Sequence, residues 1–157
     1  MGPEEIIAAY RLERHPEGGW YREIHRSSRT LEGIPGFPGK RTACTAIYFL
    51  LARGDFSAFH RLPSEEVWAH LAGDPLELVV MDREVRRIIL GPVTEGGEPV
   101  AIVHAGELQA ARTSGEYTLV TCFVAPGFEY EDFSMPTRKD LLREYPDRRE
   151  LVLSLTR

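Results

Sequence analysis

The chain has 157 residues, 43% of them hydrophobic and 27% charged, proportions that predict one soluble globular domain spanning residues 1–157. Its net charge of −5 at pH 7 argues against a nucleic acid or an anionic membrane as partner. No apolar run approaches the roughly 20 residues needed to cross a bilayer, and the charged start "MGPEEIIAAYRLERH" lacks the apolar segment of a secretory signal.

The first predicted element is a short helix at residues 3–12. Pro3 suits a first helical turn, acidic residues follow it, and apolar side chains recur after them. Residues 20–27 alternate large and polar side chains, as a strand does. The stretch 31–40 holds three glycines and two prolines and predicts a loop, whereas 42–51 is a β-branched and aromatic run typical of a buried strand.

Short predicted strands then follow one another, separated by turn sequences such as "LPSE" and "AGDP". They cover residues 55–61, 66–71, 76–81, 85–90, 100–103, 107–112 and 117–124. Helical spacing returns at 136–146, and "ELVLSL" at 150–155 predicts a last strand. Many short strands with a helix near each end predict a mainly β protein, either an antiparallel sandwich or a barrel.

Cys44 and Cys122 are too few for a disulfide framework, and both fall in predicted strands beside apolar residues. We therefore expect buried thiols and a cytoplasmic location.

The stretch "GDFSAFHRLPSEEVWAHLAG", residues 54–73, is the main candidate for a functional site. Gly54, His60, Glu66 and Gly73 fall at the spacing of the first motif of the cupin superfamily. Leu62 stands at that motif's second histidine. The second motif, Pro-x-Gly-x-x-His, is similar to "HAGELQ", in which Gly106 is kept and Gln109 replaces the final histidine.

The resemblance extends over roughly Leu12 to Arg157. It is carried by "HPEGGWYREIHRS", "TAIYFLL", "GDFSAFHR", "GDPLEL", "QAAR", "YTLVTCFVAPGFEYEDF" and "LTR". The chain resembles the cupin branch called domain of unknown function 985, or cupin type 5. This resemblance implies a jelly-roll β-barrel, commonly homodimeric, with a small-molecule pocket in the mouth of the barrel.

The same resemblance raises the question of a metal, because a mononuclear cupin site normally offers three histidines and a glutamate. Here only His60, Glu66 and the amide of Gln109 occupy ligand positions, and a neutral amide is a poor ligand for zinc, iron or nickel. His70 shares a strand face with Glu66, but about 13 Å separates the two Cα atoms at roughly 3.3 Å per residue. We expect no tightly bound metal, with a divalent ion at His60, Glu66 and Gln109 as the alternative.

A metal-free reading uses the same residues for proton transfer. A hairpin through "LPSE" would bring His60 beside Glu66, which would raise the pKa of His60 and prepare it as a general base. Tyr48 could act as the acid, and Trp68, with His70 along the same wall, offers a surface on which a ring could stack. Metal-free sugar-nucleotide epimerases, which share the jelly roll, are similar in using a histidine base with a tyrosine acid.

Three functions follow from these residues. The first is a metal-independent isomerase or epimerase acting on a sugar-like or keto metabolite, with His60, Glu66 and Tyr48 as catalytic residues and Trp68, His70 and Gln109 contacting the substrate. The second is a metal-dependent cupin oxygenase or isomerase, and the third is a non-catalytic ligand-binding module. His15 and His104 are expected in loops, without a chemical role.

Overall fold

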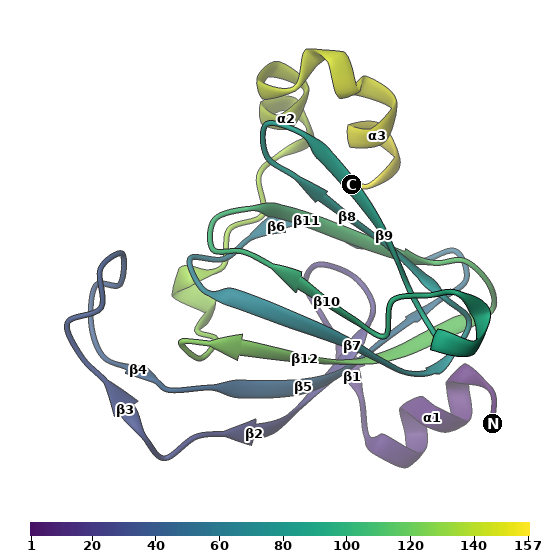
Figure 1. Cartoon of the computed structure of the whole chain (residues 1–157), viewed down its shortest axis with the longest axis horizontal. Helices are drawn as coiled ribbons and strands as arrows, with labels where there is room; N and C mark the ends of the chain where they lie inside the picture. The colour runs from purple at the N-terminus through teal and green to yellow at the C-terminus, as the bar shows by residue number, and fades with distance from the viewer.

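The computed structural model describes all 157 residues as two antiparallel β-sheets packed face to face (Figure 1). The larger sheet has the strand order β1 (Glu13–Arg14), β2 (Trp20–Arg26), β5 (Thr45–Ala52), β12 (Tyr117–Ala125), β7 (Glu65–Gly73) and β10 (Val100–Val103). The smaller sheet has the order β6 (Ser57–Arg61), β11 (Leu108–Thr113), β8 (Leu76–Met81) and β9 (Val85–Leu90). β3 (Thr30–Leu31) and β4 (Arg41–Thr42) form a separate ribbon.

The core lies between the sheets and follows from the alternation of side chains along each strand. In β7, Glu66 and Trp68 are buried, while the intervening Val67 is less so. Apolar side chains from both sheets pack around Trp68: Phe49, Leu51, Leu76, Leu78, Val80, Leu90, Ala101, Val103, Ala111, Val120 and Cys122. Both cysteines are free, Cys122 buried and Cys44 partly so.

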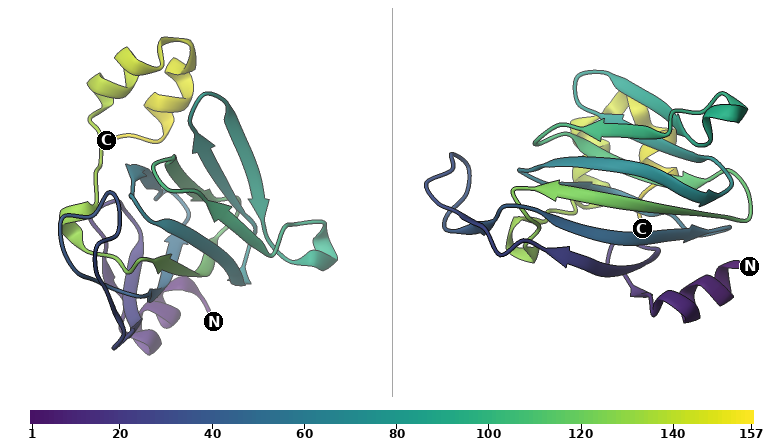
Figure 2. Two further views of the ribbon diagram at one scale, coloured as in Figure 1. Left: turned by 60° about the vertical axis from the view of Figure 1, so that its left-hand side comes forward. Right: turned by 60° about the horizontal axis from the view of Figure 1, so that its bottom comes forward.

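Helices cover the outer face of each sheet, and Figure 2 shows them on opposite sides of the sandwich. Helix α1 (Pro3–Tyr10) places Ile6 against Leu50 and Leu119 of the larger sheet. Helices α2 (Arg138–Glu144) and α3 (Arg149–Ser154) pack on the smaller sheet. Three single turns, η1 (Val93–Glu95), η2 (Tyr130–Asp132) and η3 (Pro146–Arg148), complete the elements.

The predicted last strand at 150–155 is wrong, because these residues fall largely in α3. A strand would place Leu151, Leu153 and Leu155 on one face, but Leu153 is 37% exposed. The side chains that are buried are Leu151, Val152 and Leu155, and this spacing is helical. The same leucine-rich sequence can form a strand or a helix, and packing beside α2 selected the helix.

The predicted mainly β jelly roll with short helices near both ends is confirmed. Its ten principal strands form two separate ladders, so the hydrogen bonding makes a sandwich rather than a closed barrel. No helix combines the length and apolar character required to span a bilayer.

Candidate functional site

The loop "HPEGG", residues 15–19, carries two side chains that meet in the main cavity. Its backbone closes on itself, with the His15 N–H bonded to the Gly19 carbonyl and the Gly18 N–H to the His15 carbonyl. Gly18 and Gly19 have φ angles of +108° and +78°. A β-carbon on Gly18 would lie 2.0 Å from a backbone carbonyl oxygen, so both the turn and the close packing require glycine.

Arg157 fastens this loop to the rest of the fold. Its Nη1 donates to the Glu17 carbonyl at 2.6 Å, and its Nη2 donates to the Phe56 carbonyl and to Asp55 Oδ1, each at 2.8 Å. The guanidinium also lies 4.0 Å from the centre of the Phe56 ring. These contacts hold Glu17 in the position from which its carboxyl reaches into the cavity.

We expect Arg157→Ala to lower the free energy of unfolding by about 2 kcal/mol, because hydrogen bonds that involve a charged group contribute roughly this much. Hydrogen exchange at the Gly18 and Gly19 amides should also become faster, since their loop loses its anchor. Arg14→Ala is the matched control: Arg14 pairs with Asp55 at 2.7 Å but makes no hydrogen bond to the loop. Its cost should stay below about 1 kcal/mol. Equal losses in the two variants would contradict the anchoring role.

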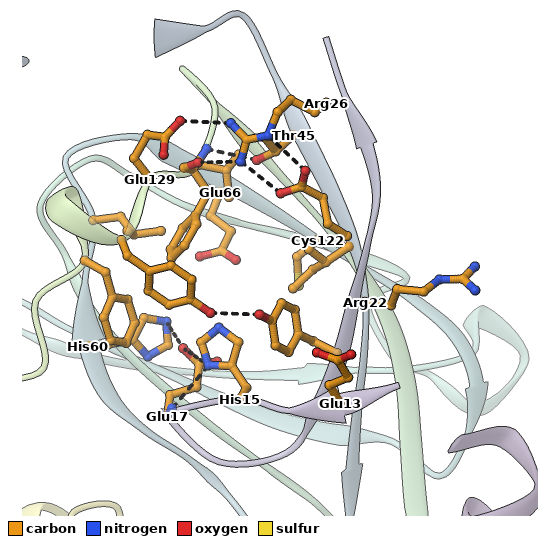
Figure 3. Close-up of a pocket in the computed structure, with 18 residues that line it drawn as sticks. Glu13, His15, Glu17, Arg22, Arg26, Thr45, His60, Glu66, Cys122 and Glu129 are labelled. Atoms are coloured by element: carbon orange, nitrogen blue, oxygen red, sulfur yellow. Dashed lines mark hydrogen bonds and ion pairs between the residues drawn. The ribbon is translucent and has the colours of Figure 1, made fainter. Parts of the chain in front are cut away.

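The cavity has a volume of about 300 Å³ and lies among loop 15–19, strands of the larger sheet and the segment 128–133 (Figure 3). Its lining combines many titratable side chains with a few apolar ones. The titratable and polar ones are Glu13, His15, Glu17, Tyr21, Arg22, Glu23, Arg26, Thr45, His60, Glu66, Cys122, Glu129 and Tyr130. The apolar ones are Ile47, Leu62, Val124, Phe128 and Phe133.

Glu17 and His60 form a buried pair. The Nδ1 atom of His60 lies 2.8 Å from the Ala58 carbonyl oxygen, which can only accept, so Nδ1 carries a proton. The other ring nitrogen, Nε2, lies 3.3 Å from Glu17 Oε2. The second carboxyl oxygen of Glu17 accepts from the Ser57 hydroxyl at 2.8 Å. A proton between His60 Nε2 and Glu17 Oε2 therefore satisfies both groups.

Burial keeps that shared proton on the carboxyl. It raises the pKa of Glu17 to about 8, against the lowering effects of Ser57 and Arg157. Burial also lowers the pKa of His60. His15, whose pKa burial and the nearby His60 lower to about 4, accepts from the Glu17 N–H through Nδ1 at 3.2 Å. At neutral pH the group consists of two neutral imidazoles and a protonated carboxyl.

Glu66 supplies the second carboxyl, which Figure 3 shows pointing toward the middle of the lining side chains. Gln109 Nε2 donates to Glu66 Oε2 at 2.6 Å, and Gln109 Oε1 accepts from the Trp68 indole at 2.9 Å. Burial raises the pKa of Glu66 to about 7, and Glu17 raises it further, while His60, Gln109 and the Cys122 thiol lower it. The result is a carboxyl that changes its charge near neutral pH.

An aromatic wall closes the other side of the cavity. The Tyr21 and Tyr130 hydroxyls lie 2.9 Å apart, and the Phe133 ring lies 5.5 Å from the His60 ring. Burial and the hydrogen bond to Tyr21 raise the pKa of Tyr130, so this phenol stays protonated. Arg41 anchors the wall through a two-pronged pair with Asp132, at 2.7 and 2.8 Å.

The structure places His60 and Glu66 in the cavity, but not across a hairpin. That part of the prediction is wrong, because β6 belongs to the smaller sheet and β7 to the larger one. The two side chains approach each other across the interior of the sandwich. Burial lowers the pKa of His60, and this effect outweighs the raising effect of Glu66 on which the prediction depended.

The other predicted site residues lie outside the cavity lining. Tyr48 faces outward and contacts Tyr10 of α1 edge-on, with ring centres 5.3 Å apart, because the alternation of β5 turns its neighbours inward instead. Trp68 is 1% exposed and belongs to the core, so it offers no stacking surface. Gln109 donates a hydrogen bond to Glu66 but does not itself line the cavity. His70 lies near the Asp74 carbonyl, beyond the cavity.

Sequence reasoning missed His15, Glu17 and the tyrosine pair. The available signal was "HPEGG", in which a histidine and a glutamate precede two adjacent glycines between a helix and a strand. Paired glycines often mark a backbone that approaches another segment closely. His15 lies in a loop, as predicted. We expected no chemical role for it, but its side chain lies beside Glu17.

The residues do not fit a cupin metal centre. Trp68 can only donate, so the Gln109 amide must turn its oxygen toward Trp68 and its nitrogen toward Glu66. Leu62 lines the cavity where a second ligand histidine would stand. No three histidine, cysteine, aspartate or glutamate side chains are arranged to hold an ion. The lining therefore lacks the ligand set of a metal-dependent cupin.

Comparisons with known proteins agree with this fold. The family model described as Cupin superfamily (DUF985) matches residues 4–136. A hypothetical protein from Leishmania major has 32% sequence identity and a TM-score of 0.92, over 99% of each chain. A protein from Shewanella oneidensis, also 32% identical, has a TM-score of 0.89 over 100% of this chain and 98% of that one. An uncharacterized protein of Saccharomyces cerevisiae is 26% identical, covering 89% of this chain and 78% of the yeast protein.

Proposed function

This chain belongs to the DUF985 family of the cupin superfamily, and from that premise we propose that its cavity catalyses metal-independent proton transfer. The reaction is an isomerisation or epimerisation of a small sugar-like or keto metabolite. One observation carries the proposal: two buried glutamates whose pKa values are raised to about 7 and about 8 flank His60 in one cavity. Strongly shifted pKa values in a cleft are typical of functional sites.

The contacts suggest a division of roles. The Glu66 carboxylate, held by Gln109, removes a proton from the carbon beside a carbonyl, and the electrons of that bond form an enolate. A pKa of about 7 suits a general base at neutral pH. Glu66 is better placed for this step than His60, because both ring nitrogens of His60 are already engaged.

The other groups complete the transfer. The hydrogen-bonded hydroxyls of Tyr21 and Tyr130 stabilise the developing negative charge on the carbonyl oxygen. Tyr48, predicted to act as the acid, lies outside the cavity lining. The Glu17–His60 pair holds a proton that can return to carbon, and Glu66 then passes its own proton back to that pair. The proton count is unchanged over one cycle.

Exchange in heavy water tests this function. Wild-type protein incubated with small aldoses and ketoses in D₂O should place deuterium on the carbon beside the carbonyl, as detected by NMR. We expect Glu66→Gln to slow this exchange by about 10²–10⁴-fold, the usual contribution of a general base. Glu65→Gln is the matched control, because Glu65 is the exposed neighbour on the same strand and should leave the rate unchanged.

The remaining outcomes separate the alternatives. Equal exchange in wild type and Glu66→Gln would contradict the role of Glu66. Specific binding of a compound without any exchange would favour a non-catalytic ligand-binding module. Stoichiometric iron, nickel or zinc that survives dialysis, measured by element analysis, would favour the metal-dependent oxygenase or isomerase and contradict our expectation of no bound metal. The cytoplasmic location and the homodimer also stay predictions, the latter tested by light scattering.

A further inference from the structure

No cationic side chain that lines the cavity has a positive charge available to an anionic ligand. Arg26 is the clearest case: its guanidinium bonds both oxygens of Glu23 at 2.9 Å and Glu129 Oε1 at 2.9 Å. A further bond at 3.1 Å joins it to the Phe128 carbonyl. Two carboxylates and a carbonyl therefore surround one positive charge at the rim, and no charge is left to attract an anion.

Arg22 does not place its positive charge inside the cavity either. Its guanidinium lies 5.9 Å from the ring centre of Tyr48, which is on the outer face of the larger sheet. Figure 3 accordingly shows the end of the Arg22 side chain pointing away from the cavity. His15 and His60 are neutral at pH 7, because burial lowers the pKa of each.

The interior offers groups suited to an uncharged polar ligand. The Tyr21 and Tyr130 hydroxyls and the Glu66 carboxyl offer hydrogen-bonding groups to such a ligand. A phosphate would bring a charge of about −1.5 to −2 beside Glu66 without a compensating cation. The volume of about 300 Å³ is small for a ligand cavity and matches a compact molecule.

We propose that the substrate of this cavity is a small, uncharged hydroxy-carbonyl compound, and that its phosphorylated counterparts are rejected. This inference rests on the proposed function for its choice of site and goes beyond it in naming the substrate class. The arginine-to-glutamate pairing at the rim, joining Arg26 to Glu23 and Glu129, is the specificity-determining feature.

Binding to matched compounds tests the inference. The probes are dihydroxyacetone and D-xylulose, each compared with its own phosphate ester by ligand-observed NMR at neutral pH and low salt. We expect both neutral compounds to bind at millimolar concentration, and each ester to bind about tenfold more weakly or not at all. The double variant Glu23→Gln/Glu129→Gln frees Arg26 and should strengthen binding of the esters about tenfold, with the neutral compounds unchanged.

Glu13→Gln controls for the simple loss of negative charge, since Glu13 lines the cavity but does not belong to the ion pairs of Arg26. It should improve ester binding much less than the double variant does. Tighter binding of the esters to wild type, or no binding of either neutral compound, would overturn the inference. Because this test reads binding alone, neutral compounds that bind without exchanging deuterium would remove the proposed catalysis and leave the charge selection standing.

Discussion

Replacing Glu66 with glutamine is expected to remove a decrease in the free energy of unfolding that the wild type shows as the pH rises from 5 to 7. This decrease is on the order of 3 kcal/mol. Burial raises the pKa of this carboxyl from 4.5 to about 7, so in that window the folded state holds a proton that the unfolded state releases. The free energy of unfolding of the wild type therefore falls as the pH rises through the window. Glutamine resembles the protonated form and does not titrate.

Urea unfolding at a series of pH values measures this difference. Glu65→Gln, on the exposed side of the same strand, should follow the wild type in parallel. The double variant Glu17→Gln/Glu66→Gln should lose the fall that continues toward pH 8, because the pKa of Glu17 is about 8. Identical slopes in Glu66→Gln and wild type would show that this carboxyl is ionised in the folded protein.

His15 supplies a check of opposite sign. Its pKa is lowered from 6.5 to about 4, so below pH 6.5 the unfolded state binds a proton that the folded state does not. Stability from this group is complete above pH 6.5 and is lost as the pH falls toward 4. His60, whose pKa burial also lowers, adds an effect of the same sign. The double glutamine variant should therefore become more stable from pH 4 to pH 6.5, when the opposing glutamates no longer mask these two histidines.

Truncation of Trp68 should have the largest effect on stability. Trp68→Ala removes a side chain that is 1% exposed and is expected to cost about 3–5 kcal/mol. Trp68→Phe keeps much of the ring but removes the indole donor, leaving the Gln109 amide oxygen buried without its partner. This variant should cost about 1–3 kcal/mol, as measured by urea unfolding.

The Trp68→Phe variant should also affect the cavity. Gln109 loses the bond that orients it, and its hydrogen bond to Glu66 lowers the pKa of that carboxyl. The pKa of Glu66 should therefore rise above about 7, as read by NMR titration of the carboxyl. An unchanged pKa would mean that Gln109 holds its place without Trp68.

Much of the fold could be predicted because it depends on local pattern. The strands 76–81, 85–90 and 100–103 have the bounds expected from their runs of apolar and β-branched residues and the turns between them. The same alternation placed Glu66 and Trp68 on one face of β7, and that face is the interior. It could not show which of the two would reach the cavity and which would fill the core.

The site itself depended on contacts between segments far apart in the chain. His60 meets Glu17 from a loop 43 residues earlier, and Arg157 holds that loop in place. Such pairs leave no periodicity, because each partner is a single polar residue in an irregular segment. Likewise, packing beside α2 made residues 149–154 a helix although their leucines alternate.

The sequence by itself determined a mainly β fold of short antiparallel strands, because hydrophobic alternation and turn residues act over a few neighbouring positions. The expectation that His60 and Glu66 face a pocket came from the resemblance to the first cupin motif. Only the tertiary structure decided which groups share a proton and which lie outside the cavity. Those properties follow from burial and from distances across the interior. A pKa depends on every group within a few ångströms, whichever part of the chain supplies it.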